Sequence, residues 1–260
     1  MNISPYFSVT LRQRLNEDMT MRNLATKTQI AYIRGVNNLC DHLQHSPETT
    51  TQEELREFQL FMVNHGVSGI TVNATLSALK FLFRITLDKP EVIARVCSVT
   101  VARKLPVVLS LEEAKRFMSC ATHPKFKAAL AVAYGSGLRV SEVVSLKVSD
   151  IDSERMLLRV EQSKGSRDRY ALLSPALVDH LRDWWRFANH EGQMFKGSWL
   201  FPGLNPIDHM TARHLSRVCK QMANAASIDK NVSMHTLRHS FATDLLRQVI
   251  SPLDALMIKH

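Results

Sequence analysis

Apolar residues at helical spacing constrain the first third of the chain more than any other feature. The clearest run recurs at steps of three or four residues: Ile30, Ile33, Val36, Leu39 and Leu43. It predicts an amphipathic helix from Thr26 that ends before Pro47. A capping-box pattern near Thr51 and a Gly-flanked start at Thr71 predict two further helices. We therefore expect residues 1–90 to form a helical bundle with short connections, preceded by a short amphipathic piece over 9–15.

The second part of the chain has a mixed pattern. Ser110 precedes a capping box, and residues 125–134 are apolar enough for a buried helix that ends at Gly135-Ser136-Gly137. Apolar runs at 156–160 and 170–173 flank a polar segment with a glycine, which predicts a β-hairpin with Lys164 at its tip. Helices are expected over 175–187 and 211–226. The predicted fold is mainly α, with one small antiparallel sheet.

Charge narrows the class of partner. The 260 residues include 33 Lys and Arg against 24 Asp and Glu, a net charge of +9. Both sides of Pro106 share the excess, with 12 against 9 before it and 21 against 15 after it. Such a bias favours a polyanionic partner, most often nucleic acid, although many basic proteins bind none.

Cysteines and apolar runs indicate the compartment. The four cysteines are far apart and form no metal-binding cluster, as expected for small buried hydrophobes in a reducing compartment. No apolar run has the length of a membrane span, and the N-terminus lacks a signal-peptide pattern. The sequence predicts a cytoplasmic protein with no membrane partner.

The most informative stretch for chemistry is residues 233–243. His235 and Arg238 are three residues apart, so on a helix they lie one turn apart on one face, followed by His239. A guanidinium can bind two phosphate oxygens, and an imidazole can transfer a proton near neutral pH. A solvated basic surface helix has the same pattern, so this stretch needs support from elsewhere in the chain.

Other cations supply that support. Arg139 follows a glycine-rich turn, and Glu142 lies one helical turn later, where it could hold the guanidinium. Lys164 is placed at a hairpin tip. The segment 98–109 is expected to be a linker, whose two cations either cross a nucleic-acid backbone or are simply solvated. The candidate contacts with a nucleic-acid backbone are Arg103, Lys104, Arg167, Arg169, Arg213, Arg217 and His239.

Taken in order, these residues resemble the tyrosine recombinases, the phage-integrase and Xer-type family. Three strings carry the resemblance: GLRVSE around Arg139, SKGSRDR around Lys164, and HTLRHSFAT from His235. The helical strings TKTQIAYIRGVNNL and GITVNATLSALKFLFRI are similar to the family's core-binding domain. The resemblance implies a helical SAM-like core-binding domain at 1–97, a linker at 98–109, and a mixed, mostly helical catalytic domain at 110–260.

The resemblance also implies a mechanism. Family members cut a DNA strand by attack of a tyrosine on the phosphate, which forms a 3′-phosphotyrosine and needs no metal or cofactor. Arg139 and Arg238 would bind the non-bridging oxygens, Lys164 would protonate the leaving 5′-oxygen, and His235 would exchange the proton of the tyrosine. The implied partners are double-stranded DNA and other recombinase subunits, with no small-molecule substrate.

The sequence departs from the family at the nucleophile. Its tyrosines, Tyr6, Tyr32, Tyr134 and Tyr170, all precede His235, whereas the family's tyrosine follows its H-x-x-R motif. Deleting one residue after Gln248 would align His260 with the family's third-position histidine; alternatively, residues 249–260 are frameshifted sequence. The enzyme assignment is therefore open. One hypothesis is an incomplete recombinase or one that takes a tyrosine from a neighbouring subunit, and the other is a DNA-binding protein that cannot cut.

Overall fold

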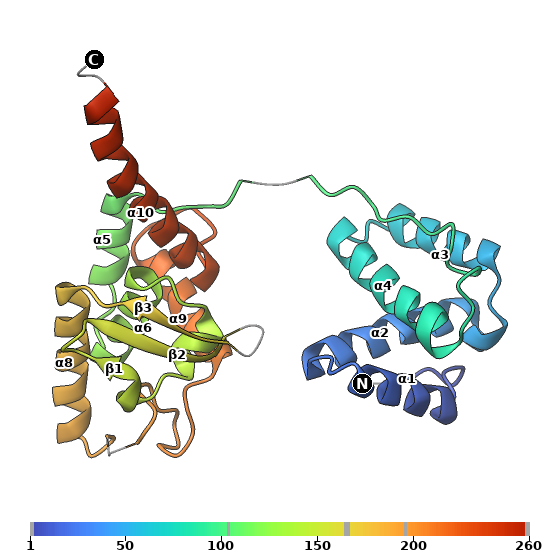
Figure 1. Cartoon of the computed structure of the whole chain (residues 1–260), viewed down its shortest axis with the longest axis horizontal. Helices are drawn as coiled ribbons and strands as arrows, with labels where there is room; N and C mark the ends of the chain where they lie inside the picture. The colour runs from blue at the N-terminus through green and yellow to red at the C-terminus, as the bar shows by residue number, and fades with distance from the viewer. Residues whose placement is uncertain (1–2, 103–104, 164–166, 195–196, 258–260) are drawn as a thin grey trace. The chain divides into compact units, whose positions relative to one another are not determined.

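The structure, a computed structural model, describes residues 3–102, 105–163, 167–194 and 197–257 (Figure 1). At 162–163, 167 and 248–257 only the backbone is described. The chain divides into two compact units, Met1–Lys104 and Leu105–His260. We refer to them as unit 1 and unit 2. The division falls inside the segment that the sequence predicts to be a linker.

Unit 1 is a helical bundle. Its elements are α1 (Val9–Met21), α2 (Thr26–Leu43), η1 (Pro47–Thr49), α3 (Gln52–Asn64), α4 (Gly69–Phe81) and η2 (Leu82–Thr86). The predicted capping box is present at α3, where the Thr51 hydroxyl accepts from the Glu54 N–H and the Glu54 carboxylate accepts from the Thr51 N–H. Gly35 lets helices α2 and α4 pack closely, since a Cβ at this position would lie only 2.9 Å from the Cβ of Ala78.

Two expectations for unit 1 need correction. The short amphipathic piece over 9–15 is a helix that runs to Met21, because Met19 extends the buried face of Leu11 and Leu15 through a polar stretch. The helix expected from Thr71 begins at Gly69 as α4, and after Phe81 the chain continues as the π-helical turn η2. After η2, Val99 exchanges two hydrogen bonds with the Asn73 side chain, so this part of the expected linker is fixed to α4.

Unit 2 is an α+β unit. Its elements are α5 (Leu111–Ser119), α6 (Pro124–Gly135), α7 (Val140–Val144), η3 (Val148–Asp150), β1 (Ile151–Asp152), β2 (Leu157–Ser163), β3 (Arg167–Leu172), α8 (Pro175–His190), α9 (Ala212–Ala225) and α10 (Met234–Met257). The sheet is antiparallel in the order β1-β2-β3, with Leu157 opposite Leu172 and Arg159 opposite Tyr170. The prediction of a mainly α fold with one small antiparallel sheet is confirmed.

The core of unit 2 surrounds α6. This helix packs against both α8 and α10, and its alanines 128, 129, 131 and 133 are buried. Trp184 of α8 is fully buried and donates its indole N–H to the Leu200 carbonyl. Small residues on α6 let two helices approach it closely, and α10 carries the predicted His235 and Arg238.

The backbone of α10 is helical without a break to Met257 (Figure 1). His260 lies outside the described residues.

Burial corrects one further expectation. Cys40 and Cys219 are buried, but Cys97 is exposed and Cys120 is partly exposed. All four thiols are free. Within the described ranges, every helix is too short or too polar to span a membrane.

Candidate functional site

The centre of the candidate site is the carboxylate of Glu142 on α7, which three arginines approach. The Arg139 guanidinium donates to Oε1 at 2.8 Å, and Arg169 donates to Oε2 at 2.8 Å. The third arginine, Arg238, has its Nη1 3.9 Å from Oε2. Glu142 is only 6% exposed, whereas the arginine side chains are 31–42% exposed. One buried negative charge thus holds a partly open cluster of three positive charges, which we call the Glu142 cluster.

A glycine turn places Arg139. Gly137 has φ +60°, and a Cβ there would lie 2.5 Å from the Phe241 ring of α10, so only glycine fits this position. Arg139 then occupies the N-cap of α7, where its N–H donates to Glu142 Oε2 at 2.7 Å. The same turn receives α10, because Arg238 donates to the Gly137 carbonyl at 2.6 Å.

Buried contacts fix the start of α10. Ser233 caps the helix by accepting from the Thr236 N–H, and Leu237 is fully buried. The buried Ser240 hydroxyl accepts from the Leu109 N–H, which fixes this end of the expected linker. Tyr134 of α6 donates to Asp244 at 2.6 Å. The predicted site residues on α10 are therefore rigidly placed relative to α6 and the glycine turn.

The electrostatics of Glu142 favour its charged form. Burial alone would raise the pKa of Glu142, but hydrogen bonds from the Arg139 backbone and guanidinium, with the charges of Arg169 and Arg139, outweigh it. The net result is a pKa below the ordinary value. At neutral pH the cluster carries one negative charge and three positive charges, so it can accept an anion.

His235 is the exposed imidazole beside this cluster. Its ring contacts His239 edge-on, with centroids 4.3 Å apart. Burial lowers the pKa of His235 below its ordinary value, and the charges of His239, Arg238 and Arg139 lower it further. A neutral imidazole at pH 7 suits a proton acceptor.

The predicted residues are not all brought together. Arg139, Arg238 and His235 lie close to one another, and Arg169 joins them through Glu142. Arg213 and Arg217 lie elsewhere on unit 2, along the exposed face of α9, where Lys220 and His214 line the same groove. Four of the predicted residues, Arg103, Lys104, Lys164 and His260, lie outside the described residues, and Arg167 is described only in its backbone.

One contact at the cluster, between Arg169 and Glu142, was not predicted from the sequence. Arg169 was expected to contact DNA. The structure pairs it with Glu142, and no local motif predicts this pairing because the two residues are 27 positions apart. The sequence places Lys220 on the same basic helix as Arg213 and Arg217, seven residues after Arg213, but Lys220 was not among the expected DNA contacts; it lines the groove with them.

The two tyrosines of unit 2 are poorly placed as nucleophiles at this cluster. The Tyr134 hydroxyl is bonded to Asp244, and burial together with that bond raises the pKa of the phenol. Tyr170 follows Arg169 on β3, and successive side chains of a strand point to opposite faces. The 66% exposed Tyr170 ring therefore points away from Glu142.

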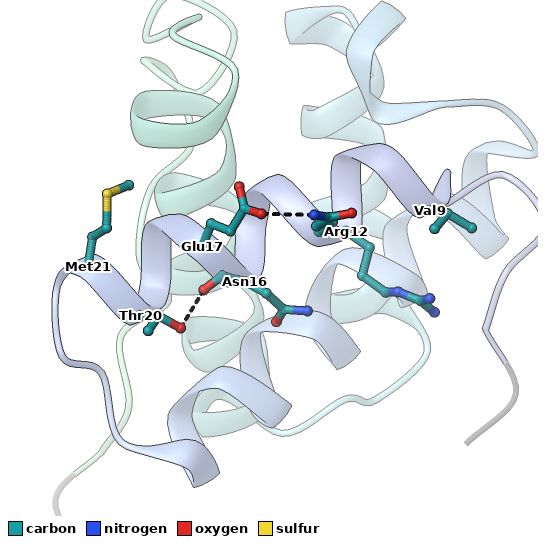
Figure 2. Close-up of a pocket in the computed structure, with 7 residues that line it drawn as sticks. Val9, Arg12, Asn16, Glu17, Thr20 and Met21 are labelled. Atoms are coloured by element: carbon teal, nitrogen blue, oxygen red, sulfur yellow. Dashed lines mark hydrogen bonds between the residues drawn. The ribbon is translucent and has the colours of Figure 1, made fainter.

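A separate groove runs along α1 of unit 1 (Figure 2). Arg12, Asn16 and Glu17 line it, with Val9 and Met21 towards its ends. Glu17 accepts from Gln13 at 2.9 Å, and Thr20 donates to the Asn16 carbonyl at 2.8 Å. The groove contains none of the predicted site residues. Elsewhere in the described part of the chain, no group of three or more His, Cys, Asp or Glu is arranged to hold a metal.

Comparison with known proteins gives consistent matches along the chain. The model of the phage integrase family matches residues 108–257, and that of the phage integrase N-terminal SAM-like domain matches residues 11–91. A putative integrase/recombinase, y4qK of Sinorhizobium fredii, is 38% identical over 238 residues, covering 91% of this chain and 75% of the relative. Tyrosine recombinase XerA of Thermococcus kodakarensis is 30% identical over 209 residues, covering 80% and 72%.

Solved structures share the fold. A lambda integrase tetramer bound to a Holliday junction has a TM-score of 0.72 at 18% identity, covering 90% of this chain and 71% of that one. The Tn1549 transposon integrase in complex with circular intermediate DNA has a TM-score of 0.71 at 19% identity, covering 93% and 88%. The fold class is therefore that of integrases. Because the phage integrase model matches more than half of the sequence, the chain belongs to the phage integrase family, the tyrosine recombinases.

Proposed function

We propose that this protein acts on double-stranded DNA as a site-specific recombinase, and that the Glu142 cluster binds the phosphate to be cut. The observation that carries the proposal is the convergence of Arg139 and Arg238 on one buried carboxylate, from segments about 100 residues apart. Their partly exposed guanidiniums keep donors for an anion. Solved integrases of the same fold are bound to DNA as dimers and tetramers, which supports DNA and further recombinase subunits as partners.

The proposed reaction is transesterification at phosphorus. A tyrosine oxygen attacks, a phosphotyrosine bond forms, and the bond to the 5′-oxygen breaks, so no net bond energy is lost. Arg139 and Arg238 stabilise the added charge of the pentacoordinate phosphorus. His235 accepts the tyrosine proton, and Lys164 donates a proton to the leaving 5′-oxygen. No metal or cofactor has a part in the proposed reaction.

A second candidate is a DNA-binding protein that does not cut. The observation in its favour is the placement of Tyr134 and Tyr170, neither of which presents its hydroxyl to the Glu142 cluster. Under this alternative the arginines still hold a phosphate. The two candidates therefore predict similar binding and different chemistry.

We also propose separate roles for the two units. Residues 1–97 form a core-binding domain, 98–109 a linker, and 110–260 the recombinase catalytic domain. The matches of the two family models to 11–91 and 108–257 support this division. A cytoplasmic location follows from the proposed action on DNA.

A suicide-substrate assay separates the candidates. The full chain is incubated with nicked duplexes from its own genomic flanks, and products are resolved on a denaturing gel. A covalent adduct that is lost in Arg238→Gln identifies the enzyme. Salt-sensitive binding without an adduct identifies the DNA-binding protein. Binding that is absent, or insensitive to salt, contradicts both.

A further inference from the structure

Arg169 and Arg238 approach the same oxygen of Glu142. Oε2 accepts from the Arg139 N–H at 2.7 Å and from Arg169 Nη2 at 2.8 Å. Among the cations whose side chains the structure describes, Arg238 Nη1 comes next, at 3.9 Å, and it donates to the Gly137 carbonyl. Since Glu142 is nearly buried, the number of donors that can reach Oε2 is small.

We infer that Arg169 is a positioning residue, whose ion pair with Glu142 occupies the oxygen that Arg238 would otherwise bind and so leaves the Arg238 guanidinium available to a phosphate. Arg169 thus acts through Arg238 and need not touch DNA. The binding of a phosphate by Arg238 rests on the proposed function. The competition between Arg169 and Arg238 for Glu142 does not, because it takes place within the protein.

The geometry of β3 supports this role. Residues 169, 171 and 173 alternate with exposed neighbours, so Arg169 lies on the inward face of the strand beside α7. Arg159, opposite Tyr170 on β2, lies on the outward face and pairs with Asp168 at 3.1 Å and Glu161 at 3.3 Å. Arg159→Gln therefore removes the same charge from the same sheet without touching Glu142, and serves as the matched control.

Removing Arg169 should redistribute the charges. Without its donor, Oε2 gains room for Arg238, and a short Arg238–Glu142 pair forms because opposite charges in a half-buried site attract strongly. The Arg238 guanidinium stays charged, but its Nη1 donor is then used by Glu142 and is less available to a phosphate. Among the described residues, the charged or titratable groups that face His235 are Arg139, Arg238 and His239, so the pKa of His235 reports the change at Arg238.

The first test is a double-mutant cycle on DNA binding by the full chain, measured by fluorescence anisotropy with a labelled duplex from its genomic flank. We expect Arg169→Gln and Arg238→Gln each to weaken binding about tenfold, and the double variant to be within about twofold of Arg238→Gln alone. Arg169→Lys should recover most of the affinity, and Arg159→Gln should cost about twofold. Additive losses, or equal losses in Arg169→Gln and Arg159→Gln, overturn the inference. If Arg169→Gln does not fold, the cycle is run with Arg169→Met, which also removes the charge, and with the same criterion of additivity.

The second test needs no DNA. The imidazole protons of His235 are titrated by NMR in wild type, Arg169→Gln and Arg159→Gln. A higher pKa of His235 in Arg169→Gln alone supports the inference, and an unchanged pKa overturns it. Failure of the wild type to bind DNA would reject the proposed function, while this titration would still decide the role of Arg169.

Discussion

At the scale of single residues, one buried carboxylate determines how three arginines are arranged. Glu142 is held by the Arg139 backbone, the Arg139 guanidinium and Arg169. Neutralising it would leave three guanidiniums close together without their shared counter-charge. The arginines are partly exposed, so water would relieve some of that repulsion.

Replacing Glu142 tests this arrangement. We expect Glu142→Gln to lower the free energy of unfolding by about 2 kcal/mol, below the full cost of breaking a buried pair because the partners can be hydrated. Glu161→Gln is the control, since Glu161 forms exposed ion pairs with Lys147 and Arg159 and should cost less than about 0.5 kcal/mol. Urea unfolding at pH 7 measures both. Equal losses in the two variants would contradict the central role of Glu142.

The pH dependence has a defined sign. The folded-state pKa of Glu142 lies below its ordinary value of 4.5, so its charge stabilises the fold above that pH. The contribution is lost as the pH falls through the lower, folded-state pKa. We therefore expect the stability difference between wild type and Glu142→Gln to be constant from pH 7 to about 5 and to shrink below about 4.5. A difference that grows on acidification would reverse this assignment.

At the scale of elements, the turn between α6 and α7 is the junction of the site. The Ser136 hydroxyl donates to the Leu172 carbonyl at the end of β3, and the Gly137 carbonyl accepts from Arg238 of α10. The Phe241 ring packs where a Gly137 side chain would lie. A change in this turn should therefore disturb helix α10 as well as the turn.

Gly137→Ala tests the junction. The substitution combines a left-handed backbone with a clash at 2.5 Å against the Phe241 ring, so we expect a loss of about 3 kcal/mol. Gly192→Ala is a matched control, because Gly192 has φ +65° but no atom within 4 Å of the added Cβ. It should cost about 1 kcal/mol. Thermal unfolding followed by circular dichroism compares them, and equal losses would show that Phe241 moves aside freely.

At the scale of the whole molecule, part of the positive charge lies in two groups of cations in unit 2. The net charge of +9 includes the Glu142 cluster and the exposed cations of α9. Arg213, Arg217 and Lys220 form none of the ion pairs found among the described residues, whereas the arginines of α8, Arg182 and Arg186, each pair with an aspartate. The cations of α9 are thus available to a polyanion.

The salt dependence of DNA binding measures this availability. We expect Arg213→Gln, Arg217→Gln and Lys220→Gln each to reduce the slope of log affinity against log salt by about 0.9, the value for one phosphate contact. Arg182→Gln, which removes one equal charge from α8, should leave the slope unchanged. The affinity for DNA is measured at salt concentrations between about 50 and 200 mM. An unchanged slope in all three α9 variants would remove this helix from the interface.

Much of the helical structure was predictable, because the signals are local. The capping boxes at Thr51 and Ser110 are both formed, and Arg139 and Glu142 meet because they are one helical turn apart. The expected hairpin is present as β2 and β3. The length of α1 was underestimated because polar residues conceal the position of Met19 on its buried face.

The sequence by itself determined the family, the order of the site residues and most helix boundaries, since these depend on motifs and short-range spacing. Only the tertiary structure decided which of the many cations share Glu142. Arg169 reaches it across 27 residues through the register of β3, and Arg238 approaches through the packing of α10 on α6. Arg169 Nη2 lies 2.8 Å from Glu142 Oε2 and is paired with it, whereas Arg238 Nη1 lies 3.9 Å from the same oxygen and remains available to a phosphate. Distances of that kind follow from long-range packing, which no local pattern encodes.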